Sequence, residues 1–456
     1  MIDLITDSRK IKQGDTFIAI KGIDNDGHNY IEQAIKNGAK KIIAEHGSYE
    51  VETEIVEDTT KYLNEYIYNN YYNKIKDIKL IGVTGTSGKT TTCFLTYTIL
   101  KSLGCKVAYI GTIGFYMDDF VRELPNTTPS IDKLYNILLE CKENNIEYVV
   151  MEVSSHALDL NRVYGLEYDA AGFTNISQDH LDYHKTIENY AQAKVALFKK
   201  LRNNKTAIIN IDDAHSNMFI LPENNNITLS ENKGNVSIYD IKLTNLGISF
   251  KFNYKEKVYE KTIDMVGKYN IYNYMTAVML VNNFGFSVEE ILKIDTKAPR
   301  GRMEMVKYGT NSIFVDYAHK PDAVKKVLEN AKEFTIGNII TIIGCGGNRD
   351  RTKRPIMGNI SSELSNYVIF TNDNPRNEEP EDIMRDIIEG VKKDNYEIIL
   401  DRKEAINKGI SLLKENDVLL ILGKGHEDYQ IVKGVKYHLD DMECVLEGIK
   451  RNNWVC

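Results

Sequence analysis

The sequence has few cysteines, and it lacks both long apolar runs and an excess of basic charge. Its six cysteines include no C-x-x-C pair, which argues against a disulfide framework or a zinc site and indicates reduced thiols in a cytoplasm. No apolar run approaches the about 18 residues of a membrane-spanning helix, and the first residues lack the basic-then-apolar layout of a signal peptide. A net charge of −8 argues against a nucleic-acid-binding surface. We therefore expect a cytoplasmic globular protein that binds no nucleic acid and does not insert into a membrane.

The 456 residues, 42% hydrophobic and 27% charged, suit two to four folded domains. Residues 1–76 contain short apolar stretches around a helix-like segment at 30–37. From residue 78, apolar runs alternate with helical patterns, which predicts βαβ units and a mostly parallel sheet. The alternating stretch 248–254 favours an antiparallel edge or hairpin, and a second βα series follows residue 301. The pattern predicts an α/β protein of three domains, at 1–76, 77–298 and 299–456.

A glycine-rich turn, TGTSGKT at 84–90, lies between a predicted strand and a predicted helix. This context is typical of a phosphate-binding loop, in which backbone N–H groups and the helix N-terminus attract an anion. Lys89 would reach the β- and γ-phosphates, and the Thr90 hydroxyl would bind Mg²⁺. Val83 occupies the first glycine position of the strict motif. The alternative is a glycine-rich turn without a ligand, but the pattern favours nucleotide binding.

Three further clusters follow in the same predicted domain. Glu152 falls at the end of a strand, where sites in α/β proteins are built, and a second strand is followed by NISQDHLD, with His180. Both suit a metal ion or phosphate contacts. Lys194 lies in an almost wholly apolar helical segment. It is either exposed or snorkelling, or it is buried and held near neutrality, in which case the amine can take up CO₂ as a carbamate and become a metal ligand.

Ten motifs, in order along nearly the whole chain, resemble those of the Mur ligase family. The resemblance begins at Asp7-Ser8-Arg9 and explains Val83, because T-G-T-x-G-K-T is the family's own variant of the loop. The motifs are TGTSGKTT (84–91), NTTPS (126–130), MEVSSHAL (151–158), NISQDHLDYH (175–184), the helix with Lys194, GRMEMV (301–306), DYAHKPDA (316–323), GCGGNRDRTKRPIMG (344–358), DNPRNEEP (373–380) and LGKGHEDYQ (422–430).

The resemblance implies a function for each domain: the N-terminal α/β domain binds a uridine nucleotide, the central domain is a P-loop ATPase, and the Rossmann-like C-terminal domain binds an amino acid. It implies an ATP-dependent, ADP-forming ligase that adds meso-2,6-diaminopimelate to the D-Glu of UDP-MurNAc-L-Ala-D-Glu through an acyl phosphate, a step of peptidoglycan synthesis needed for cell shape and division. The implied cofactors are Mg²⁺ and a CO₂-derived carbamate on Lys194. The implied state is a monomer acting on small molecules, with domain closure excluding water.

The family's site residues can be carried over onto matching positions of this sequence. The implied catalytic residues are Lys89, Glu152, His180 and Lys194, with Thr90 and Glu152 on one Mg²⁺ and His180 and carboxylated Lys194 on the other. The implied ATP contacts are Gly85, Thr86, Ser87, Gly88, Lys89, Thr90, Thr91, Asn270, Asn273, Arg302, Asp316 and His319. The implied contacts of the UDP-MurNAc-dipeptide are Ser8, Ile23, Asp24, Asn25, Asn126, Thr127, Thr128, Ser155 and Arg162. The implied diaminopimelate contacts are Arg349, Asp373, Asn374, Pro375, Arg376, Gly423 and Glu427.

The charges of this last group suit diaminopimelate, which carries a second amino-acid head. Arg376 offers a bidentate fork for the distal carboxylate, and Glu427 suits the distal ammonium. L-lysine has no distal carboxylate and would leave the arginine unpaired. The alternative for DNPR is an Asx-type turn before the helix that begins near Glu381.

Several other functions remain open at this stage. The chain starts about 20 residues into the family pattern, and Leu160 stands where the family often has Gln, so a ligase for L-lysine, another diamine or a related nucleotide peptide is an alternative. A non-catalytic P-loop nucleotide-binding protein is another, although it would not need Lys89, Thr90, Glu152, His180 and Lys194 together. A ligase like folylpolyglutamate synthase would share the loop and the lysine, but we would not expect it to carry DNPR or GHEDYQ.

Overall fold

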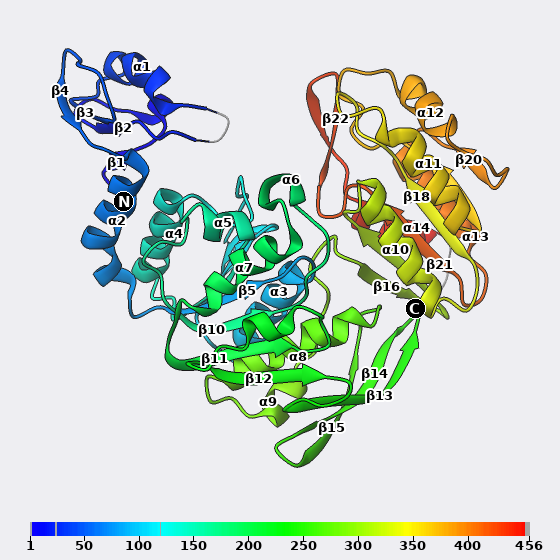
Figure 1. Cartoon of the computed structure of the whole chain (residues 1–456). Helices are drawn as coiled ribbons and strands as arrows, with labels where there is room; N and C mark the ends of the chain where they lie inside the picture. Colours follow the sequence, from blue (N-terminus) through cyan, green and yellow to red (C-terminus); the bar gives the residue numbers. More distant parts are fainter. Residues whose placement is uncertain (1, 23–24, 119, 452–456) are drawn as a thin grey trace. The chain divides into compact units, whose positions relative to one another are not determined.

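The computed structural model describes residues 2–22, 25–118 and 120–451. The chain forms two compact units, one of Met1–Ile227 with Met279–Gly285 and the other of Thr228–Val278 with Phe286–Cys456. Both units combine sheets and helices (Figure 1), which confirms the predicted α/β class. No helix of the described residues is long and apolar enough to cross a membrane.

The first unit begins with a small parallel sheet in the order β1-β2-β3-β4. Phe17 and Ile42 of this sheet belong to one apolar cluster with Ile31 and Ala34 of α1. Helix α2 begins where the Asp58 side chain accepts a hydrogen bond from a backbone N–H, and every fourth residue from Leu63 to Ile75 is buried. The elements are β1 (Leu4–Ile5), β2 (Thr16–Ile18), α1 (Ile31–Lys36), β3 (Lys41–Ala44), β4 (Glu52–Ile55) and α2 (Thr59–Ile75).

Seven strands of an 11-stranded sheet lie in the first unit, in the order β11-β10-β5-β9-β6-β7-β8. Strands β11, β10, β5, β9 and β6 are parallel, as predicted, and β7 and β8 continue the sheet antiparallel. The carboxyl ends of the parallel strands therefore meet at one edge, where the segments after β5, β9 and β10 begin. The elements are β5 (Lys79–Thr84), α3 (Lys89–Ser102), β6 (Val107–Gly111), β7 (Gly114–Met117), β8 (Phe120–Arg122), α4 (Ile131–Glu143), β9 (Tyr148–Glu152), α5 (Ser155–Asp159), β10 (Tyr168–Phe173), α6 (Leu181–His184), α7 (Ile187–Phe198) and β11 (Leu201–Asn210).

Four further strands of the 11-stranded sheet follow in the sequence, and β12 pairs parallel with β13. Strand β14 pairs antiparallel with both β13 and β15, which confirms the expectation for residues 248–254. Strand β12 and helix α8 each contribute residues to both units. The elements are β12 (Asn225–Ser230), β13 (Val236–Thr244), β14 (Gly247–Tyr254), β15 (Lys257–Ile263), α8 (Tyr269–Asn282) and α9 (Val288–Leu292).

The second unit contains a six-stranded sheet in the order β16-β17-β21-β18-β19-β20, parallel except for β16. Strands β17, β18 and β21 are buried along their whole length, because side chains of α10, α11 and α12 belong to the apolar cluster on one face and those of α13 and α14 to the cluster on the other. The elements are β16 (Glu304–Tyr308), β17 (Asn311–Asp316), α10 (Pro321–Phe334), β18 (Ile339–Ile343), α11 (Lys353–Leu364), β19 (Tyr367–Phe370), α12 (Pro380–Ile388), β20 (Tyr396–Ile398), α13 (Arg402–Leu412), β21 (Val418–Leu422), β22 (Tyr429–Val432), β23 (Val435–His438) and α14 (Asp441–Arg451).

Candidate active site

The phosphate loop connects β5 to α3 and packs closely against the segment after β10. Gly85 has a φ of +149°, and a Cβ there would lie 1.9 Å from Thr174 Oγ1. The Thr174 hydroxyl donates to the Ser87 carbonyl at 2.6 Å, and the Asn175 side chain accepts from the Ser87 N–H at 3.1 Å. Gly88 is left-handed at the N-cap of α3. The loop therefore requires glycine at two positions, and it leaves the N-terminus of a 14-residue helix as an anion site.

Two lysine amines meet at one carbonyl of this loop. Lys89 Nζ donates to the Gly85 and Thr86 carbonyls, both at 2.8 Å, and Lys194 Nζ donates to the same Gly85 carbonyl at 2.8 Å. Lys194 is only 1% exposed, and its amine lies 4.4 Å from the centre of the Tyr190 ring. Lys194 is therefore neither exposed nor snorkelling.

The surroundings of Lys194 oppose a positive charge. Burial, and next the charge of Lys89, hold the pKa of Lys194 well below its usual value. A neutral amine is the form that reacts with CO₂, and a carbamate would replace charge repulsion with an attraction between Lys89 and an anion. The geometry is therefore compatible with the predicted carbamate, which stays a prediction.

Glu152 ends β9 as a buried carboxylate with several donors. Its Oε1 accepts hydrogen bonds from the Tyr109 hydroxyl at 2.6 Å and the Thr112 N–H at 2.8 Å. Its Oε2 accepts one from the Thr90 hydroxyl at 3.0 Å. The two predicted ligands of the first Mg²⁺ are thus in contact, and carboxylate and hydroxyl oxygens are donors that suit this ion. The described residues contain no group of three or more His, Cys, Asp or Glu arranged for a metal, so substrate oxygens and water would complete the coordination.

His180, the predicted partner of Lys194 on the second Mg²⁺, has a half-exposed side chain and a left-handed backbone with φ of +53°. Its ring centre lies 4.8 Å from that of His156 and 6.2 Å from that of Tyr190. Tyr190 also contacts the Lys194 amine, so both predicted ligands border the same aromatic ring. Lys194 as a free amine would repel a cation, and this pair fits a metal only once the lysine is carboxylated.

A cavity of about 560 Å³ in the first unit contains one of the residues predicted to bind the nucleotide peptide. Arg162 lines it together with Leu160, which supplies an apolar wall, and with polar residues such as Asn64 and Asp132. Ser8 and Asn25 line a neighbouring cavity of about 450 Å³ that also includes Arg9. Ile23 and Asp24 lie outside the described residues.

The remaining residues predicted for this substrate lie near the Glu152 strand. The Thr128 hydroxyl donates to the Glu152 backbone carbonyl at 2.8 Å, and Arg162 donates to the Thr128 carbonyl at 3.1 Å. The Thr127 hydroxyl lies 3.0 Å from that of Thr112. Ser155 Oγ lies 3.0 Å from His184 Nε2, and Asn126 is exposed.

Residues predicted to complete the ATP site also occur in the second unit. Asn273 Nδ2 donates to Asn270 Oδ1 at 2.8 Å, and both side chains are buried. The Asp316 carboxylate accepts the N–H groups of Met303 and Ala318, both at 2.8 Å, so it fixes the backbone around Arg302.

The imidazole of His319 is oriented by its own chain. His319 Nδ1 donates to the Tyr317 carbonyl at 2.8 Å, because a carbonyl only accepts. This hydrogen bond assigns the proton of the neutral ring to Nδ1 and leaves the lone pair on Nε2. Burial lowers the pKa of His319, which favours that neutral form.

A cavity of about 240 Å³ in the second unit contains six of the seven residues predicted to bind diaminopimelate. They are Arg349, Asp373, Asn374, Arg376, Gly423 and Glu427. Glu427 Oε2 accepts from Asn374 Nδ2 at 2.9 Å and lies 3.4 Å from the buried Lys424 amine. Arg376 donates to the Gly347 carbonyl at 2.8 Å, and its backbone has a φ of +55°. The cavity thus offers both an arginine and a carboxylate to a ligand.

Several residues of these sites were missed by sequence reasoning. Tyr109 donates to Glu152, Lys424 neighbours Glu427, and Lys353 lines the 240 Å³ cavity. Lys353 and Lys424 lie inside the motifs that carry the resemblance, so the sequence could have indicated that they belong to the site. Tyr109 lies within a buried strand and carried no signal in the sequence.

Three domain families match the sequence and together cover most of it. The Mur ligase family catalytic domain matches residues 4–85, the Mur ligase middle domain matches 83–281, and the Mur ligase glutamate ligase domain matches 301–425. These ranges support the family resemblance found in the motifs.

Similar proteins cover nearly the whole chain. A UDP-N-acetylmuramoyl-L-alanyl-D-glutamate--2,6-diaminopimelate ligase of Clostridium botulinum is 42% identical, over 97% of this chain and 94% of that protein. One of Fusobacterium nucleatum is also 42% identical, over 98% and 94%. A solved structure of a ligase of the same name is 31% identical, with a TM-score of 0.73 over 99% of this chain and 95% of that one. MurF of Thermotoga maritima, solved with ADP, shares the fold at 20% identity and a TM-score of 0.62 over 98% and 97%. The chain therefore belongs to the Mur ligase family.

Proposed function

We propose that this ligase adds meso-2,6-diaminopimelate to the D-Glu γ-carboxylate of UDP-MurNAc-L-Ala-D-Glu, coupled to the conversion of ATP to ADP and phosphate. The observation that carries the proposal is the cavity in which Arg376 and Glu427 offer opposite charges to one ligand. A distal carboxylate and a distal ammonium would pair with these two groups. The name printed for relatives 42% identical over nearly the full chain agrees with this substrate.

The proposed reaction has two steps. The γ-phosphoryl group of ATP moves to an oxygen of the D-Glu γ-carboxylate, giving an acyl phosphate and ADP. The amine of diaminopimelate then attacks the carbonyl carbon, the carbon–oxygen bond to phosphate breaks, and inorganic phosphate and a proton are released. Both steps require anions to approach each other, so positioning and charge neutralisation supply most of the catalysis.

The residues at the edge of the large sheet suit this task. Lys89 would move from the loop carbonyls to the β- and γ-phosphates, and the helix N-terminus would stabilise their charge. Thr90 and Glu152 would hold one Mg²⁺, and His180 and carboxylated Lys194 the second. Bound Mg²⁺ would offset the repulsion between ATP and the substrate carboxylate.

The wider organisation that we propose follows the same chemistry. We divide the chain into a nucleotide-peptide domain at 1–76, an ATPase domain at 77–298 and an amino-acid domain at 299–456. Because Lys89 belongs to the first unit and Arg376 to the second, turnover requires the two units to bring their ligands together and exclude water from the acyl phosphate. We propose a cytoplasmic monomer, since ATP and a nucleotide-linked precursor are its substrates.

Oxygen labelling tests the proposal. The purified protein is incubated with ATP, Mg²⁺, diaminopimelate and UDP-MurNAc-L-Ala-D-Glu whose γ-carboxylate carries ¹⁸O. With both γ-carboxylate oxygens labelled, we expect a product heavier than the labelled substrate by one diaminopimelate less one ¹⁸O-labelled water, and one labelled oxygen in the released phosphate. Product without labelled phosphate would refute the acyl-phosphate route, and no product would refute the proposed substrates.

L-lysine is the second candidate amino acid. Leu160 lies on the wall of the 560 Å³ cavity and not in the amino-acid cavity, so it does not favour lysine over diaminopimelate. Arg376 lines the 240 Å³ cavity, and bound lysine, which has no distal carboxylate, would leave its charge unpaired.

A further inference from the structure

Two loops that border the amino-acid cavity are joined by a set of direct hydrogen bonds. One loop follows β18 and the other follows β19. The Gly347 N–H donates to the Asn374 carbonyl at 2.8 Å, and Arg376 returns a hydrogen bond to the Gly347 carbonyl at 2.8 Å. A Cβ on Gly347 would lie 1.9 Å from the Pro375 carbonyl oxygen, so the two backbones are in close contact. The position of the Arg376 guanidinium therefore depends on both loops.

A buried arginine from α11 connects the same two loops. Arg354 is fully buried, and its Nη1 donates to Glu378 Oε2 and to Asp386 Oδ2, both at 2.8 Å. Its Nη2 donates to Glu378 Oε1 at 2.9 Å and to the Gly346 carbonyl at 3.1 Å. One guanidinium thus contacts the loop after β18, the loop after β19 and helix α12.

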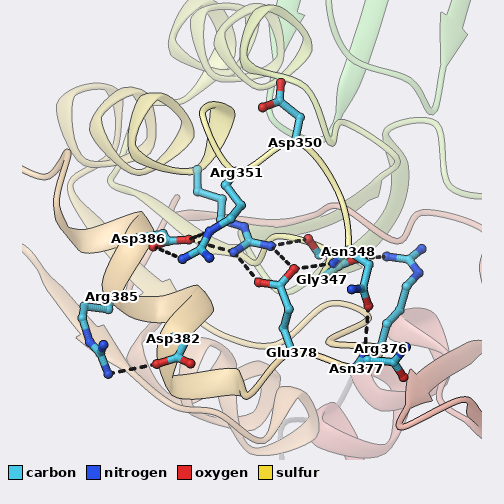
Figure 2. Close-up of polar contacts among 12 residues, drawn as sticks. Gly347, Asn348, Asp350, Arg351, Arg376, Asn377, Glu378, Asp382, Arg385 and Asp386 are labelled. Atoms are coloured by element: carbon cyan, nitrogen blue, oxygen red, sulfur yellow. Dashed lines mark hydrogen bonds and ion pairs between the residues drawn. The ribbon is translucent and has the colours of Figure 1, made fainter.

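Glu378 receives further hydrogen bonds on the side of the first loop. Its carboxylate accepts the N–H of Asn348, and the Asn348 side chain accepts the N–H of Asn377 at 3.0 Å. In Figure 2 one dashed line joins Glu378 to Asn348, and Arg376 is joined to Gly347. The Glu378 carboxylate, two residues after Arg376, therefore forms its hydrogen bonds with residues other than Arg376.

Within the part of the chain that the structure describes, this arrangement leaves Arg376 without an internal counter-ion. Among the described residues, the hydrogen bonds of the Arg376 guanidinium go to backbone carbonyls, those of Gly347 and Asn374, and it forms no ion pair. The hydrogen bonds from Arg354 hold the pKa of Glu378 below its usual value, so this neighbour stays ionised at neutral pH. If Glu378 were released, it would be an anion within reach of Arg376 and would compete with a ligand carboxylate.

We propose that Arg354 is a positioning residue of the amino-acid site, which fixes the two loops and holds Glu378 away from Arg376. The guanidinium of Arg376 is thereby kept open for a carboxylate at the distal end of the incoming amino acid. The inference rests on the proposed function for the identity of that amino acid, but the contacts that carry it belong to the protein alone.

Steady-state kinetics separate this role from a general structural one. We expect Arg354→Met to raise the KM for diaminopimelate at least about tenfold while the KM values for ATP and the nucleotide peptide change less than about twofold. Adding Glu378→Gln to Arg354→Met removes the competing charge, and we expect it to restore a large part of the lost affinity. Arg385→Met removes an exposed ion pair of α12 and serves as the matched control, with kinetics like those of the native protein.

Two outcomes of the kinetics would overturn the inference. A similar rise in all three KM values would mean that Arg354 only supports the fold. A double variant no better than Arg354→Met would mean that Glu378 does not compete for Arg376. If Arg354→Met does not fold, Arg354→Lys takes its place: it keeps a charge beside Glu378 but loses the fork, and we expect an intermediate KM for diaminopimelate with the other two unchanged.

Amide hydrogen exchange tests the positioning without relying on the substrate. We expect faster exchange in peptides covering 344–350 and 373–379 of the Arg354 variant, and native rates there in Arg385→Met. Unchanged exchange in these peptides would overturn the inference whatever amino acid the enzyme uses. Failure of the native protein to use diaminopimelate would instead refute the proposed function, and the exchange result would still decide whether Arg354 holds the loops.

Discussion

At the scale of single residues, two lysine amines, those of Lys89 and Lys194, donate to the same Gly85 carbonyl. Two ammonium groups on one oxygen repel each other, and Lys194 has almost no water to stabilise its charge. Carboxylation of Lys194 removes that conflict and creates an oxygen ligand beside the phosphate loop. This is the physical reason to expect that Lys194 contributes to catalysis and not only to the packing of α7.

We predict that Lys194→Ala abolishes ligation, because the second metal loses a ligand. Added bicarbonate should not restore activity, whereas a short-chain carboxylic acid should restore part of it by supplying the missing carboxylate. The rate of phosphate release measures both the loss of activity and its recovery with the carboxylic acid. Lys199→Ala, which removes an exposed lysine at the end of the same helix, is the control and should retain activity. Full activity of Lys194→Ala would rule out the carbamate.

We predict that Arg376→Ala weakens diaminopimelate binding far more than ATP binding. Losing a bidentate carboxylate contact should cost about 1.5–3 kcal/mol, which is a rise in KM of roughly ten- to a hundredfold. Initial rates at varied concentrations of each substrate give the KM for diaminopimelate and the KM for ATP. Arg385→Ala, at an exposed position, is the control. Equal losses for both substrates would mean that DNPR is only a structural turn.

At the scale of elements, a second buried ion pair, Arg402–Asp441, lies at the carboxyl end of the sheet in the second unit. Arg402, at the start of α13, and Asp441, at the start of α14, are fully buried and form two hydrogen bonds of 2.7 Å. Arg402 also donates to the Leu422 carbonyl at 3.0 Å, directly before Gly423 of the amino-acid cavity. The pair therefore joins both helices to the end of β21.

We predict that Arg402→Met lowers the free energy of unfolding by about 3–5 kcal/mol, because it leaves the Asp441 carboxylate buried and unpaired. The double variant Arg402→Met with Asp441→Leu should recover much of that loss. Urea denaturation gives the values, and Lys403→Met, which breaks an exposed pair with Glu447, should be near neutral. A double variant less stable than the single one would contradict this reasoning.

The Arg354 cluster should also give stability a dependence on pH. Hydrogen bonds from Arg354 lower the pKa of Glu378, and those from Arg351 and then Arg354 lower the pKa of Asp386. Lowered carboxylate pKa values stabilise the folded state above the unfolded values, about 4.3 and 3.9, and this contribution is lost as the pH falls through the folded values. The stability difference between the native protein and Arg354→Met should therefore be constant from neutral pH to about 5 and shrink below about 4. A difference that grows on acidification would contradict the assignment.

The sequence was sufficient to predict the elements that bury a continuous apolar run. Strands β5, β9, β18 and β21 could be placed from their residues alone, because strands covered on both faces are apolar throughout. Whether Lys194 is buried could not be decided, since helix α7 is apolar on most sides and a single lysine fits either face. The Arg354 cluster was missed for the opposite reason: Glu378 and Asp386 lie 24 and 32 residues away, in charge-rich segments whose side chains look solvent-exposed.

At the scale of the whole molecule, the residues that we propose for the reaction are divided between the two units. The first unit has the phosphate loop, Lys194 and the 560 Å³ cavity, and the second has the amino-acid cavity. If the proposed sites are right, the amino acid is selected by residues of one unit and the carboxylate is activated by residues of the other. It also means that a change in amino-acid specificity can be confined to the second unit, where Arg354, Arg376 and Glu427 lie.

The most direct test of this account compares amino acids in one assay. Purified native protein receives ATP, Mg²⁺ and UDP-MurNAc-L-Ala-D-Glu with meso-diaminopimelate, with L-lysine or with no amino acid, and phosphate release and product mass are recorded. We expect turnover with diaminopimelate, together with its tripeptide product, and little or none in the other two tubes. Turnover with lysine at a similar rate would contradict the assignment of Arg376 to a distal carboxylate, and no turnover in any tube would contradict the proposed ligase reaction.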